Sequence, residues 1–81
     1  MKAILTKYHG ATDTRGARIT ASDCDGNRCS VPYDHSLNAD GNHRAAAAEL
    51  CLRFKWHGQL VSGGLGNKGT AHVWVDDPYT V

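Results

Sequence analysis

The sequence predicts an α+β domain: a largely antiparallel β-sheet with a single helix packed on one face, in the order three strands, one helix, two strands. Apolar and polar residues alternate over residues 17–24 and again over 70–75, which is typical of half-buried strands. Between these stretches lies an alanine-rich run with high helix propensity. Because the chain offers only one helix, a parallel doubly wound sheet is excluded.

Length and composition indicate one domain spanning residues 1–81, with 41% hydrophobic and 21% charged residues. The formal net charge of +1 argues against a strongly basic nucleic-acid binder. No apolar run approaches the roughly 20 residues that span a membrane, and the one after Met1 is too short for a signal peptide. We therefore expect a cytoplasmic protein with no membrane partner and with reduced cysteines.

Five strands are expected, each bounded by turn residues. Their ranges are 2–8, 17–24, 28–33, 59–63 and 70–75. Pro32 confines the third strand to a sheet edge or to its own end, because proline cannot donate to a ladder. Asp76-Asp77-Pro78 stops the fifth strand, and residues 79–81 are expected to be a frayed end.

The turn Asp25-Gly26-Asn27 is the strongest hairpin signal in the chain and controls two of its three cysteines. If Gly26-Asn27 are the central residues, Cys24 lies opposite Cys29 at a distance that allows a disulfide. If Asp25-Gly26 are central, the two cysteines do not face each other. Both registers remain open at this point.

The expected helix covers about residues 40–56, with Asn38 or Asp40 as its N-cap and Gly58 ending it. Its apolar face has helical spacing and consists of Ala46 or Ala47, with Leu50, Cys51 and Phe54. We expect that face to pack on Ile4 or Leu5, Ile19, Val61 and Val73. In the last strand, either Trp74 or the flanking valines face the helix, and both alternatives remain open.

Three sequence patterns bear on catalytic or ligand chemistry. Residues 64–69 match G-x-G-x-x-G, but a strand follows them where a dinucleotide site needs a helix. The spacing of Cys24, Cys29, His35, His43 and Cys51 does not fit a structural zinc site. Cys29 with His35 and Asp34, or Ser62 alone, are candidate nucleophiles without a recognised motif. We therefore expect no enzyme activity, no cofactor and no metal.

An interaction surface is the remaining kind of site, and aromatic and arginine side chains dominate such surfaces. The candidates are Tyr8, Arg15, Arg18 and Trp74. Arg15 and Arg18 flank Gly16, so both can reach one surface. The alternative is a single-stranded nucleic-acid platform, with basic residues beside a stacking Tyr8 or Tyr33. Its basic residues would be Lys7, Arg15, Arg18 and Arg28, interleaved with Asp13, Asp23 and Asp25, which weaken the positive field.

Several short segments spread over the chain have a recognisable pattern. They are MKAILTKY at 1–8, TRGARI at 14–19, Asn42-His43-Arg44-Ala45-Ala46 with Leu50, Trp56-x-Gly58-x-Leu60, and Gly63-Gly64. With these segments, most of the chain resembles a family of roughly 80-residue proteobacterial proteins carried by phages, plasmids and integrated elements. The resemblance implies no catalytic motif and assigns no functional residue.

Proteins of this size and setting often inhibit a host defence complex, as anti-CRISPR proteins do for CRISPR-Cas. By that analogy, we expect a partner among host protein complexes, and nucleic acid is disfavoured. We also expect a homodimer, because a sheet covered by one helix leaves a face and its edges unpaired.

Overall fold

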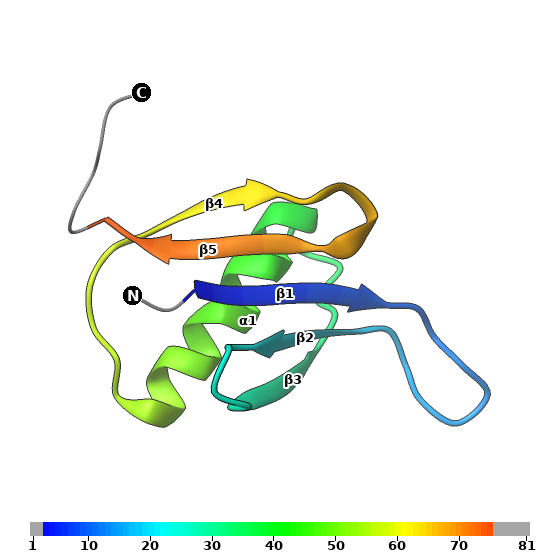
Figure 1. The fold of residues 1–81 in the computed structure, drawn as a ribbon. Helices are drawn as coiled ribbons and strands as arrows, with labels where there is room; N and C mark the ends of the chain where they lie inside the picture. Colours follow the sequence, from blue (N-terminus) through cyan, green and yellow to red (C-terminus); the bar gives the residue numbers. More distant parts are fainter. Residues whose placement is uncertain (1–2, 76–81) are drawn as a thin grey trace.

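The computed structural model describes residues 3–75 and contains, in that range, one α-helix, one short 3-10 helix and five strands (Figure 1). The elements are β1 (Ala3–His9), β2 (Arg18–Ser22), β3 (Arg28–Pro32), α1 (Ala39–Phe54), β4 (Leu60–Gly64), η1 (Gly66–Lys68) and β5 (Thr70–Trp74). Their order confirms the α+β class that the sequence predicts.

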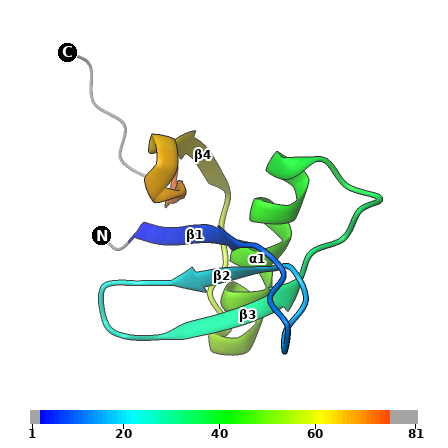
Figure 2. The same ribbon diagram turned by 90° about the vertical axis from the view of Figure 1, so that its right-hand side faces the viewer.

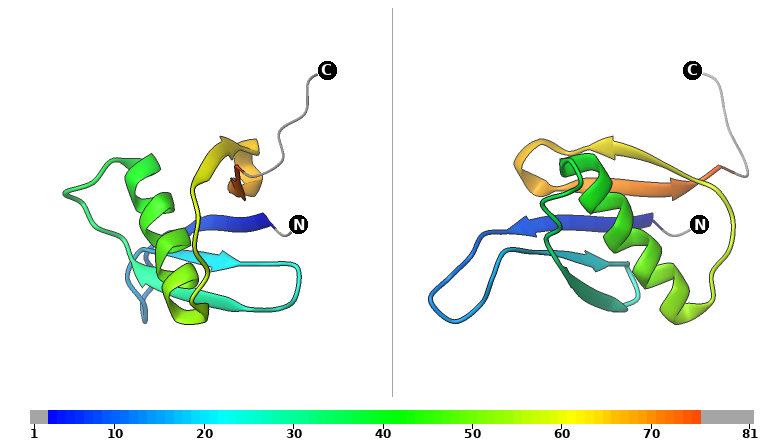
Figure 3. Two further views of the ribbon diagram at one scale, coloured as in Figure 1. Left: turned by 90° about the vertical axis from the view of Figure 1, so that its left-hand side faces the viewer. Right: turned by 180° about the vertical axis from the view of Figure 1, so that it is seen from behind.

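The five strands form one sheet in the order β3-β2-β1-β5-β4, and every neighbouring pair is antiparallel. The sheet therefore has β1 at its centre and β3 and β4 at its edges. Helix α1 crosses one side of the sheet (Figures 2 and 3). No other described element covers the opposite side, which we call the open face.

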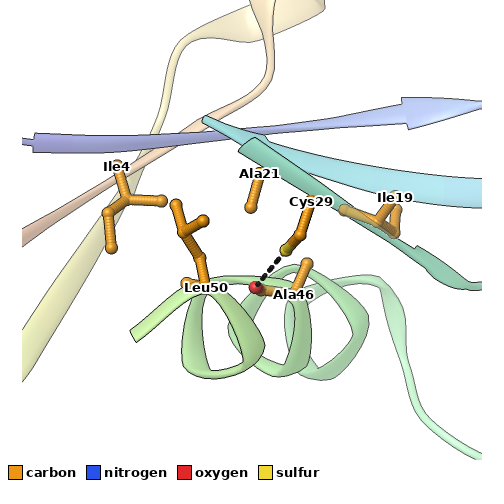
Figure 4. Close-up of a cluster of buried hydrophobic side chains, with 7 residues drawn as sticks. Ile4, Ile19, Ala21, Cys29, Ala46 and Leu50 are labelled. Atoms are coloured by element: carbon orange, nitrogen blue, oxygen red, sulfur yellow. Dashed lines mark hydrogen bonds between the residues drawn. The ribbon is translucent and has the colours of Figure 1, made fainter. Parts of the chain in front are cut away.

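The core lies between α1 and strands β1 to β3 (Figure 4). Its buried apolar residues are Ile4, Ile19, Ala21, Cys29, Ala46, Ala47 and Leu50. Two of the three helix positions are alanines, so the helix backbone approaches the sheet closely and few large side chains fill the space. The core is thin, as expected for a domain of this size.

The two ends of α1 have different kinds of cap. Asn38 is the N-cap, and its Oδ1 accepts a hydrogen bond from the Gly41 N–H at 2.7 Å, which confirms one of the two predicted caps. The predicted C-terminal stop at Gly58 is wrong. Lys55 ends the helix in the left-handed conformation, with φ of 58°, and the Trp56 N–H closes the last turn on the Cys51 carbonyl at 2.9 Å.

The expectation that Val61 and Val73 pack under the helix is wrong. Ile4 is buried on the helix side and lies opposite His72, so alternation along β5 places Val73 on the open face. Val61 lies opposite Val73 and is also exposed. The same alternation places Trp74 on the helix side, where it lies half-buried against the core. Of the two alternatives for this strand, Trp74 and not the flanking valines faces the helix.

Phe54 was also expected in the core, and it is exposed. It is the last residue of α1, directly before the left-handed turn at Lys55, and its ring stacks on Trp56 with centroids 5.3 Å apart. The chain reverses there before Phe54 can reach the sheet. Cys51, from the same predicted face, is half-buried and packs at the margin of the core.

The β2–β3 hairpin has a register that neither sequence alternative described. Ser22 lies opposite Arg28, and the Asp23 N–H bonds the Asn27 carbonyl at 3.0 Å, so residues 24–26 form the loop. Asp23 Oδ1 accepts the backbone N–H groups of Asp25 and Asn27 at 2.9 and 3.0 Å. The Asp23 carboxylate thus sets a three-residue loop where two residues were expected.

This register separates the two cysteines that a disulfide would join. Cys29 lies opposite Ala21 and points into the core, where its Sγ lies 3.8 Å from the Ala46 carbonyl oxygen, whereas Cys24 is exposed in the loop (Figure 4). Both are free thiols, as is Cys51. The disulfide alternative is therefore wrong. Burial raises the pKa of the Cys29 thiol.

Three expectations lie outside the described residues: a first strand beginning at Lys2, the strand stop at Asp76-Asp77-Pro78, and the frayed end at 79–81. Over residues 3–75, no helix combines the length and the apolar character needed to cross a bilayer.

Candidate functional site

Three arginines gather on the open face, over β2, β3 and the loop before β2. Arg15, Arg18 and Arg28 line a shallow hollow of about 360 Å³ together with His9, Thr20 and Ser30. Arg15 and Arg18 also line an adjoining hollow that extends toward Pro32. No Asp or Glu lines either hollow. We call Arg15, Arg18 and Arg28 the arginine surface.

Local hydrogen bonds and strand pairing place two of these arginines, Arg15 and Arg18, in the fold. Arg15 lies in a turn closed by the Thr12 N–H on the Arg15 carbonyl at 2.7 Å and by the Arg15 N–H on the Thr12 hydroxyl at 3.1 Å. Arg18 lies in β2 between His9 and Pro32, and its Nη1 is buried without a hydrogen-bond partner among the described residues. A buried, unpaired donor carries a free-energy cost.

The structure brings together Arg15 and Arg18, but not all four predicted interaction residues. Tyr8 lies opposite the buried Ile19, hence on the helix side, where its ring meets Tyr33 edge to face at 5.4 Å. Trp74 is also on the helix side, with its ring 6.0 Å from that of Trp56. Neither aromatic residue shares a face with the arginines.

An exposed apolar strip lies beside the arginine surface, on the β1, β5 and β4 part of the open face. Its large members are Leu5, Val61 and Val73, which are exposed by 38%, 53% and 37%. Val61 lies opposite Val73, and Leu5 lies opposite Ala71, two residues before Val73 in β5. This strip was not expected from the sequence, because both valines were predicted to lie in the core.

A second polar feature, on the helix side, centres on the buried His72. Its Nδ1 lies 2.7 Å from the Ser62 hydroxyl, and its Nε2 lies 2.9 Å from the Thr6 hydroxyl. The Thr6 oxygen also lies 2.7 Å from Nδ1 of His43 on α1. Ser62 and His72 line a cleft of about 530 Å³ between α1 and β4, with Arg44 at its margin. We call the four hydrogen-bonded residues Thr6, His43, Ser62 and His72 the His72 cluster.

The cluster holds His72 in its neutral form. Burial lowers the pKa of this imidazole, and the nearby His43 and Arg44 lower it further. A neutral imidazole has one donor and one acceptor, so one of its two hydroxyl partners accepts and the other donates. Ser62, a candidate nucleophile from the sequence, thus shares a hydrogen bond with an imidazole whose other nitrogen is held by a threonine hydroxyl.

We expect the stability of the protein to fall as the pH drops below about 6.5, the ordinary pKa of histidine. The unfolded chain binds a proton at His72 at a higher pH than the folded chain does, so acid favours unfolding. Urea unfolding at pH 7.5 and pH 5.5 tests this. The loss should be smaller in His72→Gln than in wild type, and equal losses in the two proteins would contradict the assignment.

The remaining sequence patterns do not come together as sites. Residues 66–68 form η1 inside the β4–β5 hairpin, and β5 follows where the dinucleotide motif requires a helix. Within residues 3–75, no three His, Cys, Asp or Glu side chains are grouped so as to hold a metal ion. Cys29 points into the core, away from the exposed Asp34 and His35.

Comparison with known proteins gives no assignment: no family model, no curated protein and no solved structure matches the chain.

Proposed function

We propose that this chain is an accessory protein of a phage or mobile element that binds and inhibits a host defence complex through protein–protein contact, in the manner of an anti-CRISPR protein. One observation supports the mode of binding: the open face carries an apolar strip next to three arginines. Protein interfaces combine apolar contact with arginine anchors in this way. The mobile-element setting and the host target follow from the resemblance and from the size of the chain.

The proposed partner surface is acidic where it meets Arg15, Arg18 and Arg28, and apolar where it meets Leu5, Val61 and Val73. A carboxylate placed in the hollow would lie beside the side chains of Arg15, Arg18 and Arg28, which line it. The proposal places the protein in the cytoplasm of the host cell, where such complexes work.

Nucleic-acid binding by the same face remains the alternative, and the arrangement of aromatic residues disfavours it. A single-stranded platform needs rings on the basic face for the bases to stack on. The tyrosines suggested for this role, Tyr8 and Tyr33, pack against each other on the helix side. A steep loss of binding with added salt would point to phosphate contacts and against the protein partner.

Charge reversal at the arginine surface should abolish inhibition without unfolding the protein. We expect Arg15→Glu/Arg18→Glu to weaken binding to the inhibited complex by about 2 kcal/mol or more, roughly 30-fold in Kd. The measurements are phage plaque formation on a host with an active CRISPR-Cas system, affinity for the complex, and thermal melting.

Two further double variants serve as comparisons. Arg15→Glu/Arg28→Glu keeps Arg18, whose side chain is partly buried, and should lose binding as well. Arg44→Glu/Arg53→Glu makes the same charge change on exposed positions of α1 and should keep it. A folded Arg15→Glu/Arg18→Glu protein that binds normally, with loss in the α1 variant, would transfer the site to the helix exterior.

We further propose that the working form of the protein is a homodimer.

A further inference from the structure

Strand β4 is an edge strand whose outward backbone groups belong to alternate residues. The Val75 N–H bonds the Gln59 carbonyl at 3.0 Å, and the Leu65 N–H bonds the Gly69 carbonyl at 2.8 Å. In an antiparallel ladder, hydrogen-bonded pairs alternate with non-bonded pairs. Residues 61 and 63 therefore bond to β5, while Leu60, Ser62 and Gly64 direct their N–H and C=O groups away from the sheet.

The two edges of the sheet differ in how they resist pairing with another strand. Edge strand β3 carries Arg28 and ends at Pro32, and charge and proline are the usual devices that block strand addition. Edge strand β4 reads Leu-Val-Ser-Gly-Gly, with neither. It is an uncharged edge whose outward backbone groups bond to no other described strand, which is the form that accepts another strand.

The sequence of β4 is complementary to itself in the register that gives its backbone the most hydrogen bonds. In an antiparallel pair of two copies centred on Ser62, each Ser62 lies opposite the other and each Leu60 lies opposite Gly64. All these residues have outward backbone groups, so three pairs each exchange two hydrogen bonds. Centring the pair on Val61 or Gly63 would leave only two such pairs within β4, with Val61 opposite Val61 or Gly63 opposite Gly63.

The side chains fit in the same register. Each large residue of β4 lies opposite a glycine of the other copy: Leu60 faces Gly64 on the helix side, and Val61 faces Gly63 on the open face. Val61 is 53% exposed in the single chain, and a Cβ at Gly63 would meet no atom within 4 Å. The second copy thus packs against the side of an exposed valine, and β4 itself brings no charged side chain to the junction.

From these observations we propose that β4 pairs with β4 of a second copy, in antiparallel register centred on Ser62, to form a ten-stranded sheet with five strands from each copy. The twofold axis of such a pair is perpendicular to the sheet, so both open faces lie on the same side. The two apolar strips meet at the centre, and one arginine surface lies beyond them on each side. The pairing itself does not depend on the proposed function.

The oligomeric state tests the pairing. Wild type should have twice the 8.7 kDa mass of one chain in sedimentation equilibrium, and Gly63→Lys should have the mass of one chain. The lysine meets open space in the single chain and displaces Val61 of the other copy in the pair. Gly16→Lys, the same change at another open glycine, should remain a dimer. A wild-type monomer, or a folded Gly63→Lys dimer, would overturn the proposal.

Cross-linking tests the register without a destabilising charge. Opposed residues of a hydrogen-bonded pair have Cα atoms about 5.5 Å apart, within disulfide range. In a Cys24→Ser background, Ser62→Cys should form an intermolecular disulfide under mild oxidation. Ser30→Cys, at the other edge, should not. Cross-linking of Ser30→Cys but not of Ser62→Cys would show that the chain pairs through β3 and would overturn the assignment to β4.

Discussion

Leu50→Ala should lower the free energy of unfolding by about 2–4 kcal/mol. Leu50 is fully buried and is the largest helix residue in the core, where it lies beside Ile4 and Ala21 (Figure 4). The neighbouring helix positions are alanines, which cannot move to fill the cavity. A chain of this length has a total stability of roughly 4–12 kcal/mol, so the loss is a large part of it.

Leu52→Ala is the matched control for this substitution, because it makes the same change two residues along the same helix at a side chain that is 74% exposed. It should change stability by no more than about 0.5 kcal/mol. Urea unfolding followed by circular dichroism measures both. Equal effects of the two substitutions would show that the helix presents a different face to the sheet.

Gly69→Ala is the second substitution with a large expected effect, about 2 kcal/mol or more. Gly69 precedes β5 with φ of 114°, which L-residues rarely adopt. A Cβ at this position would also clash with the Thr6 carbonyl oxygen of β1. That oxygen belongs to the backbone of the central strand, so relief would require β1 and β5 to separate.

Gly16→Ala is the control for Gly69→Ala. Gly16 lies in the loop before β2 without a positive φ, and an added Cβ would have no atom within 4 Å. We expect its melting temperature to stay within a few degrees of that of wild type. A Gly69→Ala protein as stable as Gly16→Ala would mean that the β4–β5 turn approaches β1 less closely than described.

The fold class could be predicted from the sequence because its signals are local. Alternation in the strands, the alanine-rich run and the cap at Asn38 each depend on a few neighbouring residues. Which face of β5 meets the helix could not be predicted, because either residues 70, 72 and 74 or residues 71, 73 and 75 could form the buried side. The structure buries His72 and exposes Val73, since Ser62 and Thr6 supply the hydrogen bonds that a buried imidazole needs.

The candidate site was predictable to a similar extent. Arg15 and Arg18 flank a short bend, so their common surface follows from the sequence. The positions of Tyr8 and Trp74 depend on which face each strand presents to the helix, and a shift of one residue moves a side chain to the other face. The apolar strip of Leu5, Val61 and Val73 could not be predicted for the same reason. Its members come from three strands, and they form one strip only when each strand turns the correct face to the helix.

The position of β1 at the centre of the sheet has a consequence for how the protein forms during synthesis. Its partners are β2, which comes before α1 in the chain, and β5, the last of the described strands. A nascent chain ending after α1 can pair β1 with β2 and β3 and pack the helix on them. One long edge of β1 then stays unpaired until β5 is made, because Ala3 lies opposite Val73. Over that interval the unpaired edge of β1 can pair with a strand of another nascent chain and start aggregation.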